Sequence, residues 1–273
     1  MSESQSPVRR VIAIEFGLRE SLKSEVHMSY QLYGEPDGDQ HTTYYFWLIE
    51  HVLGPILVDT GFYPEGGKRR NRQMHRHPVA ALEALGVDAK DVVLVIMTHL
   101  HWDHAGNLLD FPNADFILAK SEREFWNSDL ARNKLFSAYF DPEAGRDLDI
   151  LESQGRLRLF TGAAEPVPGV RVLEVGGHSP GQAIVEIDTK DGVLLLTSDA
   201  VHFNDTLEKR MPFCSMTDLP TGFEVFDMIE SRLKSGTYVD VVTGHDPVVA
   251  TNYPPVDLKS APFAVVLSPK EAV

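Results

Sequence analysis

Cysteine is the scarcest chemical group in this sequence, with one residue, Cys214, among 273. A single cysteine excludes a disulfide within the chain, and we expect Cys214 to be a small apolar group in a loop. Long apolar runs are also missing, because no stretch approaches the length of a signal-peptide core or a membrane span. These absences indicate a cytoplasmic protein that does not bind membranes.

Basic residues are few, since 25 Lys and Arg stand against 40 Asp and Glu and give a formal charge of −15. Such a charge opposes any general affinity for nucleic acid or an anionic membrane, so a small-molecule partner is expected. The exception is local, at Lys68, Arg69, Arg70, Arg72 and Arg76, with no acid among them. Three roles are open for this basic stretch. It is a solvated loop, it lies at the rim of a homodimer, or it lies over a binding site and contributes a positive charge there.

Composition predicts one large core, because 43 % of the residues are hydrophobic and no Pro-, Gly- or Ser-rich linker divides the chain. We therefore expect a single domain over residues 1–273. Residues 1–10, with three serines before a proline, read as a disordered terminus.

Residues 98–107 carry the strongest chemical signal, because His99, His101, Asp103 and His104 follow directly on the apolar run at 92–97. That run is short and rich in β-branched residues, as in a strand buried on both faces. Alternate side chains of an extended segment point the same way, whereas His104 projects differently as the chain turns. Imidazole and carboxylate suit zinc and similar ions, and paired metals about 3.5–4 Å apart recur in hydrolases.

Four side chains cannot complete two metal sites, so further ligands are expected at other strand ends. His178 follows the predicted strand at 170–175, Asp199 follows 193–196, and His245 follows 238–242. Glycines beside His178 and His245 allow sharp turns that bring the rings close to their neighbours.

This order of residues resembles the metallo-β-lactamase superfamily of hydrolases, through His-x-His-x-Asp-His followed by a distant His, an Asp and a last His. The resemblance implies an α/β fold, a four-layer αβ/βα sandwich of two mixed sheets flanked by helices. It also implies two divalent ions, zinc first, with manganese, iron or cobalt as alternatives. The implied ligands are His99, His101 and His178 for one ion, Asp103, His104 and His245 for the other, and Asp199 bridging both.

Within the superfamily the sequence is most similar to the N-acyl homoserine lactonases and related small-lactone hydrolases. The likeness rests on residues 57–61, on the His-x-His-x-Asp-His-Ala-Gly-Asn block and on residues 244–247. It implies opening of a small lactone, an N-acyl homoserine lactone or another ring lactone such as 4-pyridoxolactone. Those lactonases usually carry a Tyr three residues after the bridging Asp, where this sequence has His202.

Other activities of the superfamily fit less well. Thioesterases of the glyoxalase II type usually have a C-terminal helical region with basic residues, and that pattern is missing from this sequence. Diiron flavoproteins need a flavin-binding domain, for which no residues are left over. A metal-bound protein without catalysis would not need the complete ligand set.

The ligand set predicts hydrolysis by a bridging hydroxide, because two divalent ions lower the pKa of a shared water toward neutrality. Asp103, Asp199 and His202 are the expected catalytic residues, with His202 hydrogen-bonding the substrate or protonating the leaving oxygen. Asp59 is expected to orient a ligand histidine, although a plain turn residue is the alternative. The residues expected to line the substrate pocket are Trp102, Phe62, Tyr63, His202, Met211 and Phe213, and core packing is the alternative for Met211 and Phe213.

Strands and helices alternate in the remaining sequence. The other predicted strands cover residues 11–16, 43–49, 56–58, 115–119, 156–160 and 183–187, the last forming a hairpin with 193–196. A helix is expected from Pro78 to Gly86, a second opened by a capping box at residues 121–124, and a third capped by residues 221–224 and ended by Gly236. The tail at 253–273 is expected to cover the sandwich.

Overall fold

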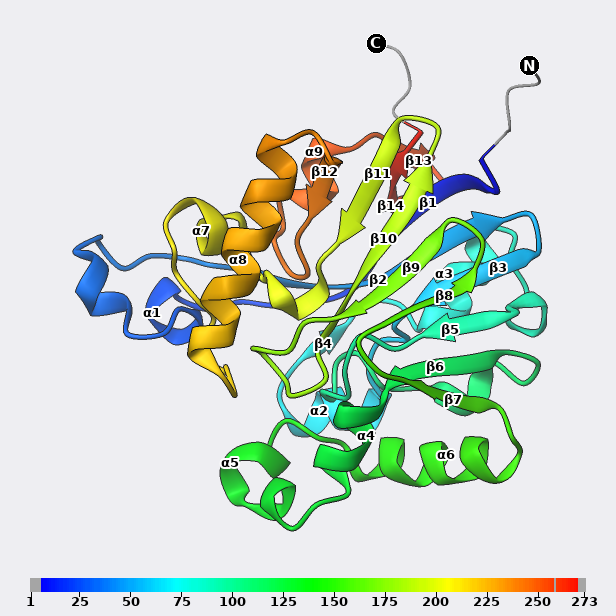
Figure 1. Cartoon of the computed structure of the whole chain (residues 1–273), viewed down its shortest axis with the longest axis horizontal. Helices are drawn as coiled ribbons and strands as arrows, with labels where there is room; N and C mark the ends of the chain where they lie inside the picture. Colours follow the sequence, from blue (N-terminus) through cyan, green and yellow to red (C-terminus); the bar gives the residue numbers. More distant parts are fainter. Residues whose placement is uncertain (1–5, 258, 270–273) are drawn as a thin grey trace.

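The computed structural model describes residues 6–257 and 259–269, and within these the strands form a nine-stranded and a five-stranded sheet (Figure 1). The large sheet has the order β13 (Pro255–Asp257), β14 (Ala261–Ser268), β1 (Val8–Arg19), β2 (Thr42–His51), β3 (Gly54–Val58), β5 (Leu94–Ile96), β6 (Asp115–Ala119) and β7 (Leu157–Phe160), with β4 (Gln73–Met74) paired to β1. The small sheet has the order β12 (Tyr238–Val242), β11 (Gly192–Leu196), β10 (Ala183–Thr189), β9 (Val170–Glu174) and β8 (Ala163–Val167). Both sheets are mixed, because β3, β5, β6 and β7 run parallel in one and β11 and β12 in the other.

Helices connect these strands. The α-helices are α1 (Lys23–Val26), α2 (Pro64–Arg69), α3 (Pro78–Ala84), α4 (Lys120–Trp126), α5 (Lys134–Ser137), α6 (Pro142–Ser153), α7 (Asn204–Glu208), α8 (Leu219–Lys234) and α9 (Val249–Asn252). Short 3-10 helices are η1 (Tyr30–Tyr33), η2 (Ala89–Asp91), η3 (Leu108–Asp110), η4 (Leu130–Arg132) and η5 (Ser198–Ala200).

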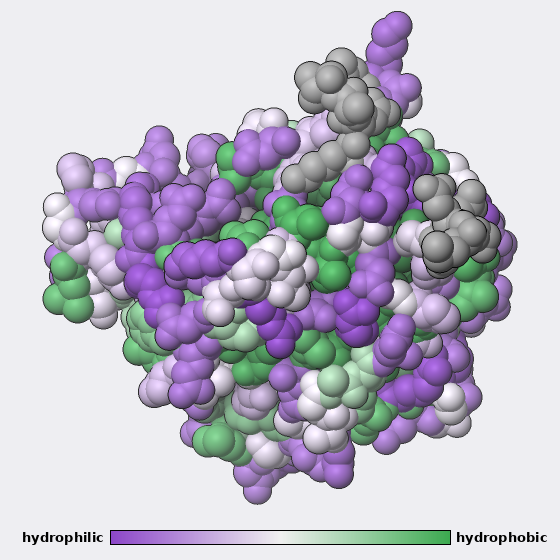
Figure 2. All heavy atoms as spheres, turned by 45° about the horizontal axis from the view of Figure 1, so that its top comes forward, coloured by the Kyte–Doolittle hydropathy of each residue, from purple (hydrophilic) through white to green (hydrophobic). Residues whose placement is uncertain are grey.

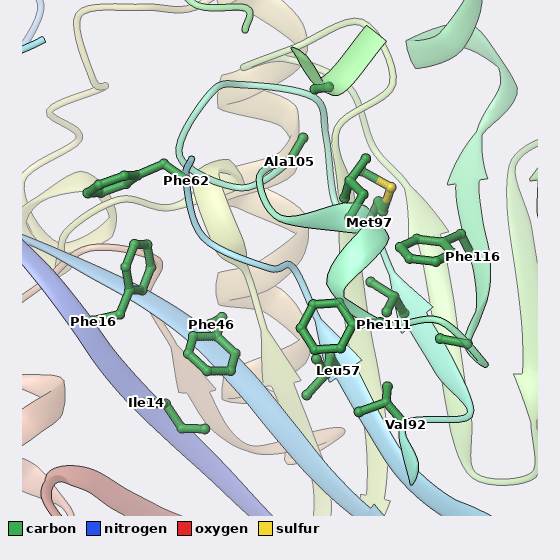
Figure 3. Packing of buried hydrophobic residues seen from close by; sticks show 14 of the residues in the cluster. Ile14, Phe16, Phe46, Leu57, Phe62, Val92, Met97, Ala105, Phe111 and Phe116 are labelled. Carbon is green, nitrogen blue, oxygen red and sulfur yellow. The ribbon is translucent and has the colours of Figure 1, made fainter. Parts of the chain in front are cut away.

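Three buried clusters show that the elements stack in four layers. One cluster lies between the sheets, where Tyr45 and Ile56 of the large sheet share a core with Val185 and Leu196 of the small one. A second joins the outer face of the large sheet to α3, α4 and α6, and Figure 3 shows Phe46, Leu57 and Phe111 within it. The third packs α8 on the small sheet. This arrangement confirms the predicted sandwich of two mixed sheets flanked by helices.

The predicted strands are all present, but several boundaries differ. Only Leu94–Ile96 of the apolar run forms the buried strand β5, and Val93 beside it is 38 % exposed. The prediction that residues 1–10 are disordered is wrong for its last part: β1 starts at Val8, which pairs with His51, while residues 1–5 lie outside the described residues. The tail adds strands β13 and β14 at the edge of the large sheet instead of covering it.

Two helix caps were predicted wrongly. α4 begins at Lys120 after Ala119, without a side-chain cap, because Ser121 and Glu122 bind other partners. α8 begins at Leu219, where the carboxylate of Asp218 accepts from the amide of Thr221. Propensity at a cap is weak compared with the tertiary partners that such polar side chains can find.

The face of the molecule drawn in Figure 2 is largely polar. On the face drawn in Figure 2, hydrophilic residues surround several separate groups of hydrophobic ones. Within the described residues, no helix combines the length and the apolar character needed to cross a membrane.

Candidate metal centre

The seven proposed ligands meet where strands of both sheets end. The loop after β5 carries four of them, the β9–β10 turn carries His178, η5 after β11 carries Asp199, and the turn after β12 carries His245. Their ligand atoms form two groups, each within 4.8 Å: His99, His101, His178 and Asp199 in one, and Asp103, His104 and His245 in the other. The sequence-based expectation that one edge of the sandwich gathers these side chains is therefore confirmed.

The first group is formed by three buried imidazoles around one oxygen of Asp199. His101 Nδ1 lies 2.8 Å from His178 Nε2, and Asp199 Oδ2 lies 3.3 Å from that same nitrogen. His99 Nε2 lies 3.7 Å from Asp199 Oδ2 and has no hydrogen-bond partner among the described residues.

The second group faces the other oxygen of Asp199. His104 Nδ1 donates to Asp59 Oδ2 at 2.8 Å, and His245 Nδ1 donates to the carbonyl oxygen of Thr43 at 2.8 Å. When the two rings are neutral, these bonds use the proton on Nδ1, so each Nε2 carries a free lone pair. The two Nε2 atoms lie 3.3 Å apart, 3.0 and 2.9 Å from Asp199 Oδ1. Asp103 Oδ2 lies 3.8 Å from each.

These residues fit divalent metal ions. Lone pairs and carboxylate oxygens that face one another in a buried space repel unless cations separate them. Imidazole and carboxylate are the ligands that zinc and its neighbours accept, and a histidine whose other nitrogen donates to a carboxylate or carbonyl is the usual form of such a ligand.

Burial and charge act differently on the two groups. Burial lowers the pKa of His99 and His178 far below its usual range and that of His101 to about 3. Burial also opposes protonation of His104 and His245, but nearby carboxylates, Asp199 foremost, outweigh it and raise the pKa of both. The carboxylates therefore make the second group the more attractive one for positive charge.

Asp59 holds the loop at residues 98–107 in place, and it contacts the ring of His104 as predicted. Its two oxygens accept from the amide and hydroxyl of Thr98, each at 2.8 Å, in addition to His104. Asp59 is fully buried and has a left-handed backbone, with φ of 60°. Such a conformation is unfavourable for a non-glycine residue and persists where surrounding contacts impose it.

The Ala-Gly-Asn end of the motif ties the loop to the Asp59 turn. A Cβ on Gly106 would lie 2.5 Å from the backbone of Phe62 and Tyr63, so only glycine allows this approach. The amide of Asn107 donates to the carbonyls of Thr60 and Phe62. Gly244 has a similar role before His245, because a Cβ there would lie 2.5 Å from the carbonyl oxygen of Ser198.

Glu122 is a positioning residue that sequence reasoning missed. Its fully buried carboxylate accepts from the amides of Leu100 and Gly181, the hydroxyl of Ser179 and the indole of Trp126. It thereby joins the loop that carries His101 to the loop that carries His178. The sequence offered no signal for this, since Glu122 read as part of a helix cap.

Two cavities adjoin the centre, and both are lined by His101, His178, Tyr139 and Ser215. One has mainly apolar walls that include Trp126, Leu135, Phe136 and Met216. The other is lined by Trp102, His202 and Phe213 together with members of both ligand groups.

The predicted pocket residues therefore separate into two sets. Trp102, His202 and Phe213 line the second cavity, and His202 stacks on Phe213 with ring centroids 3.8 Å apart. Phe62, Tyr63 and Met211 line neither cavity. Phe62 is instead fully buried between Phe16, Tyr44 and Trp102 (Figure 3 labels Phe16 and Phe62). The Tyr63 hydroxyl donates to Asp147, and Met211 is 1 % exposed.

His202 contacts the centre through Asp199. Its Nε2 lies 2.9 Å from Asp199 Oδ2, and Asp199, His202 and His245 form a third group of ligand atoms within 4.8 Å. Burial lowers the pKa of His202 despite the neighbouring Asp199 charge.

The basic stretch divides among several environments. Lys68 pairs with Glu65 at the surface, Arg69 and Arg70 pair with Asp141, and Arg76 lies over the ring of Phe263. Arg70 also lies over the ring of Trp102, 4.9 Å from its centroid. Arg72 is the member that lines the second cavity, beside Arg19, Thr42 and Tyr44, which sequence reasoning missed.

The comparisons with known proteins agree with this geometry. The sequence matches the family model of the metallo-beta-lactamase superfamily over residues 40–222. It is 31 % identical over 182 residues to the N-acyl homoserine lactonase of Bacillus cereus, covering 61 % of this chain and 67 % of that protein. It is 30 % identical over 267 residues to N-acyl homoserine lactonase AttM of Agrobacterium fabrum, covering 85 % and 92 %.

A solved structure extends the likeness to the fold. The crystal structure of a quorum-quenching N-acyl homoserine lactone lactonase superposes with a TM-score of 0.70 at 25 % identity, covering 89 % of this chain and 94 % of that one. The chain therefore belongs to the metallo-beta-lactamase superfamily and is a metal-dependent hydrolase homologous to the lactonases.

Proposed function

We propose that this protein opens the ring ester of a small lactone, with an N-acyl homoserine lactone as the first candidate substrate and another ring lactone such as 4-pyridoxolactone as the second. The observation that carries the proposal is the pair of buried ligand groups on either side of Asp199, next to an apolar cavity. Two relatives at about 30 % identity are N-acyl homoserine lactonases, which supports the same substrate class.

The ligand assignment follows from the two groups. His99, His101 and His178 would hold one divalent ion, Asp103, His104 and His245 the other, and Asp199 would contact both through its separate oxygens. Zinc is the proposed metal, since it accepts this mixture of imidazole and carboxylate, although manganese, iron and cobalt accept it too. When bound, such a pair supplies an activated water and polarises the ester carbonyl.

Neighbouring groups fix the orientation and the spacing of the proposed ligand side chains. Asp59 and the Thr43 carbonyl fix the tautomers of His104 and His245, so that each ring presents a lone pair. Glu122 fixes the spacing of the His101 and His178 loops. Closely held ligands lower the reorganisation needed during the reaction.

We assign to His202 a hydrogen bond to the substrate. Burial keeps its imidazole neutral, and a neutral imidazole can donate a single hydrogen bond. It lines the cavity, and its Nε2 lies 2.9 Å from Asp199 Oδ2. Its single proton would be free for the substrate carbonyl or the leaving oxygen once Asp199 is engaged by metal ions instead of by this ring. It would then act where a tyrosine acts in the lactonases that this sequence resembles.

The apolar cavity is suited to an acyl chain. Leu135, Phe136 and Met216 line it, and it shares His101 and His178 with the metal centre. Burial of each methylene contributes about 0.8 kcal/mol, so longer chains should bind more tightly until the cavity is full. A thioester of similar shape is the competing substrate, because the same chemistry would cleave it.

A substrate panel tests the proposal. Metal-loaded protein is given N-acyl homoserine lactones of increasing chain length, a bicyclic aromatic lactone, an acyl thioester and a phosphodiester, and acid release is followed by titration. We expect lactone opening to be fastest and to rise with chain length. Thioester or phosphodiester cleavage without lactone opening would overturn the proposal.

A further inference from the structure

Two arginines, Arg19 and Arg72, line the wall of the second cavity. β1 and β4 pair antiparallel with Gly17 opposite Met74 and Leu18 opposite Gln73. Arg19 is the last residue of β1, and Arg72 directly precedes β4. Both arginines line the cavity that holds His101, Asp103 and Asp199, and both line a neighbouring polar hollow together with Glu20.

Two positive charges that line one cavity repel each other unless a negative charge lies near them. The wider protein makes this pair more unusual, because its formal charge is −15 and most arginines of the basic stretch are engaged elsewhere. A cationic pair at this position is thus a local feature of the cavity, set against an acidic molecule.

Neither guanidinium has a strong acidic partner in the part of the chain that the structure describes. Arg19 lies 3.9 Å from Glu25, whose side chain is 52 % exposed. Arg72 donates to the carbonyl oxygens of Arg70 and Asn71, and its buried Nε has no hydrogen-bond partner there. Asp103, which shares the cavity, belongs to the proposed metal ligands. The pair therefore keeps donors for an anion from outside the chain.

We propose that Arg19 and Arg72 bind an anionic group of the substrate, a carboxylate or a phosphate, while the ester is opened at the adjacent metal centre. This inference rests on the proposed hydrolysis of a lactone, and it narrows the substrate class to lactones with an anionic substituent, which N-acyl homoserine lactones do not carry. The apolar residues line one cavity, the arginines line the other, and His101 and His178 belong to both. The fitting substrate carries an apolar group on one side of its ester and a negative charge on the other. The planar fork of a guanidinium matches the two oxygens of such an anion.

A matched pair of lactones tests this inference: the γ-carboxylate of γ-butyrolactone and the corresponding carboxamide, which differ in charge but little in shape. We expect metal-loaded wild-type protein to favour the carboxylate in kcat/KM. Arg72→Gln and Arg19→Gln should each lower kcat/KM for the carboxylate about 10- to 100-fold, the size of a lost charge-assisted bond, and leave the carboxamide within about threefold.

Two further variants control for charge and geometry. Arg76→Gln removes the same charge from the same stretch, at a side chain that packs on Phe263 away from the cavity, and should change neither substrate. Arg72→Lys keeps the charge without the fork and should fall between wild type and Arg72→Gln. Equal losses on both lactones in Arg72→Gln and Arg19→Gln would overturn the inference.

A binding measurement separates this inference from the proposed function. Calorimetry with 3-oxocyclopentanecarboxylate and its carboxamide, which have no ester to cleave, measures binding without hydrolysis, and the Gln variants isolate the part that the arginines contribute. Tighter binding of the carboxylate that is lost in Arg19→Gln, a variant that leaves the α2 loop intact, supports the inference even if neither lactone is opened. Equal binding of the two ketones, or binding unchanged by both Gln variants, rejects it whatever the protein hydrolyses.

Discussion

The two ligand groups on either side of Asp199 differ in how the fold prepares them for a metal ion. His99, His101 and His178 are kept neutral by burial, which lowers their pKa. His104 and His245 have a raised pKa, because the carboxylates around them outweigh the effect of burial.

The two groups also differ in the hydrogen bonds that hold their side chains in place. The second group is held through its rings, by Asp59 on His104 and by a backbone carbonyl on His245. The first is held through its backbone, by Glu122 bonded to Leu100 and Gly181. The first group therefore offers lone pairs at neutral pH, whereas a metal ion entering the second displaces protons.

The largest effect is expected at Asp199, which joins the two groups. Asp199→Asn removes the negative charge that faces His104 and His245 on one oxygen and His178 on the other. We expect wild-type protein to bind near two equivalents of metal by elemental analysis, and the variant to lose most metal and activity. Asp205→Asn, at a carboxylate that pairs with Lys23 and Lys209, is the matched control and should keep both. A variant at Asp199 that keeps both ions and full activity would remove its bridging role.

Replacing His202 tests whether this imidazole, which lies beside Asp199 but outside the two ligand groups, also binds metal. His202→Ala should keep both ions and lower kcat about 10²–10⁴-fold, because its hydrogen bond is assigned to the transition state. His27→Ala, which removes a buried imidazole outside both cavities, controls for the loss of packing. Loss of one equivalent of metal would make His202 a ligand, and a raised KM with unchanged kcat would make it a binding residue only.

A substitution at Asp59 should weaken metal binding at the second ligand group and leave the first group almost unaffected. An amide at this position places an NH₂ against either the Thr98 amide or His104 Nδ1, and both are donors in the present arrangement. If His104 changes tautomer in response, its Nε2 no longer offers a lone pair. Asp59→Asn should therefore weaken the second ion about 10- to 100-fold and leave the first almost unchanged.

Asp110→Asn is the matched control for that substitution, since Asp110 faces His77 at the surface. Titration of metal into metal-depleted protein gives the two affinities separately. Equal weakening of both ions would mean that Asp59 supports the whole loop and not the His104 ring.

The sequence predicted well which side chains meet at this edge, because their signal is local. Residues 98–104 directly follow a buried strand, and His178, Asp199 and His245 each follow another, so strand-end geometry alone brought them together. The Asp59 role was also predictable, since a carboxylate at a neighbouring strand end reaches the same edge.

The cavity walls and supports were not predictable in this way. A short pairing between β1 and β4, far apart in the sequence, brings Arg19 and Arg72 to one cavity, and no local pattern in the sequence marks this. Glu122 resembled a helix cap because propensity does not report the distant donors that occupy it. Phe62 and Met211 are aromatic or apolar like true pocket residues, and only packing distinguishes a core side chain from a wall.

The smallest expected effect is a difference in pH dependence between the two ions. Groups with a raised pKa hold protons at higher pH, so protons compete with metal at His104 and His245 first as the pH falls. Groups with a lowered pKa take up protons only at much lower pH, so His99, His101 and His178 stay free to bind. Each proton that must leave reduces the apparent affinity about tenfold per pH unit below the pKa of its group. Dialysis against a limiting free metal concentration, at steps from about pH 8 to about pH 5 around the range where histidines titrate, should show the affinity for the ion at His104 and His245 falling more steeply with pH than the affinity for the ion at His99, His101 and His178. Loss of both equivalents along one curve would mean that the carboxylates around Asp199 act on the two groups alike, and the contrast between them would then lie in their supports alone.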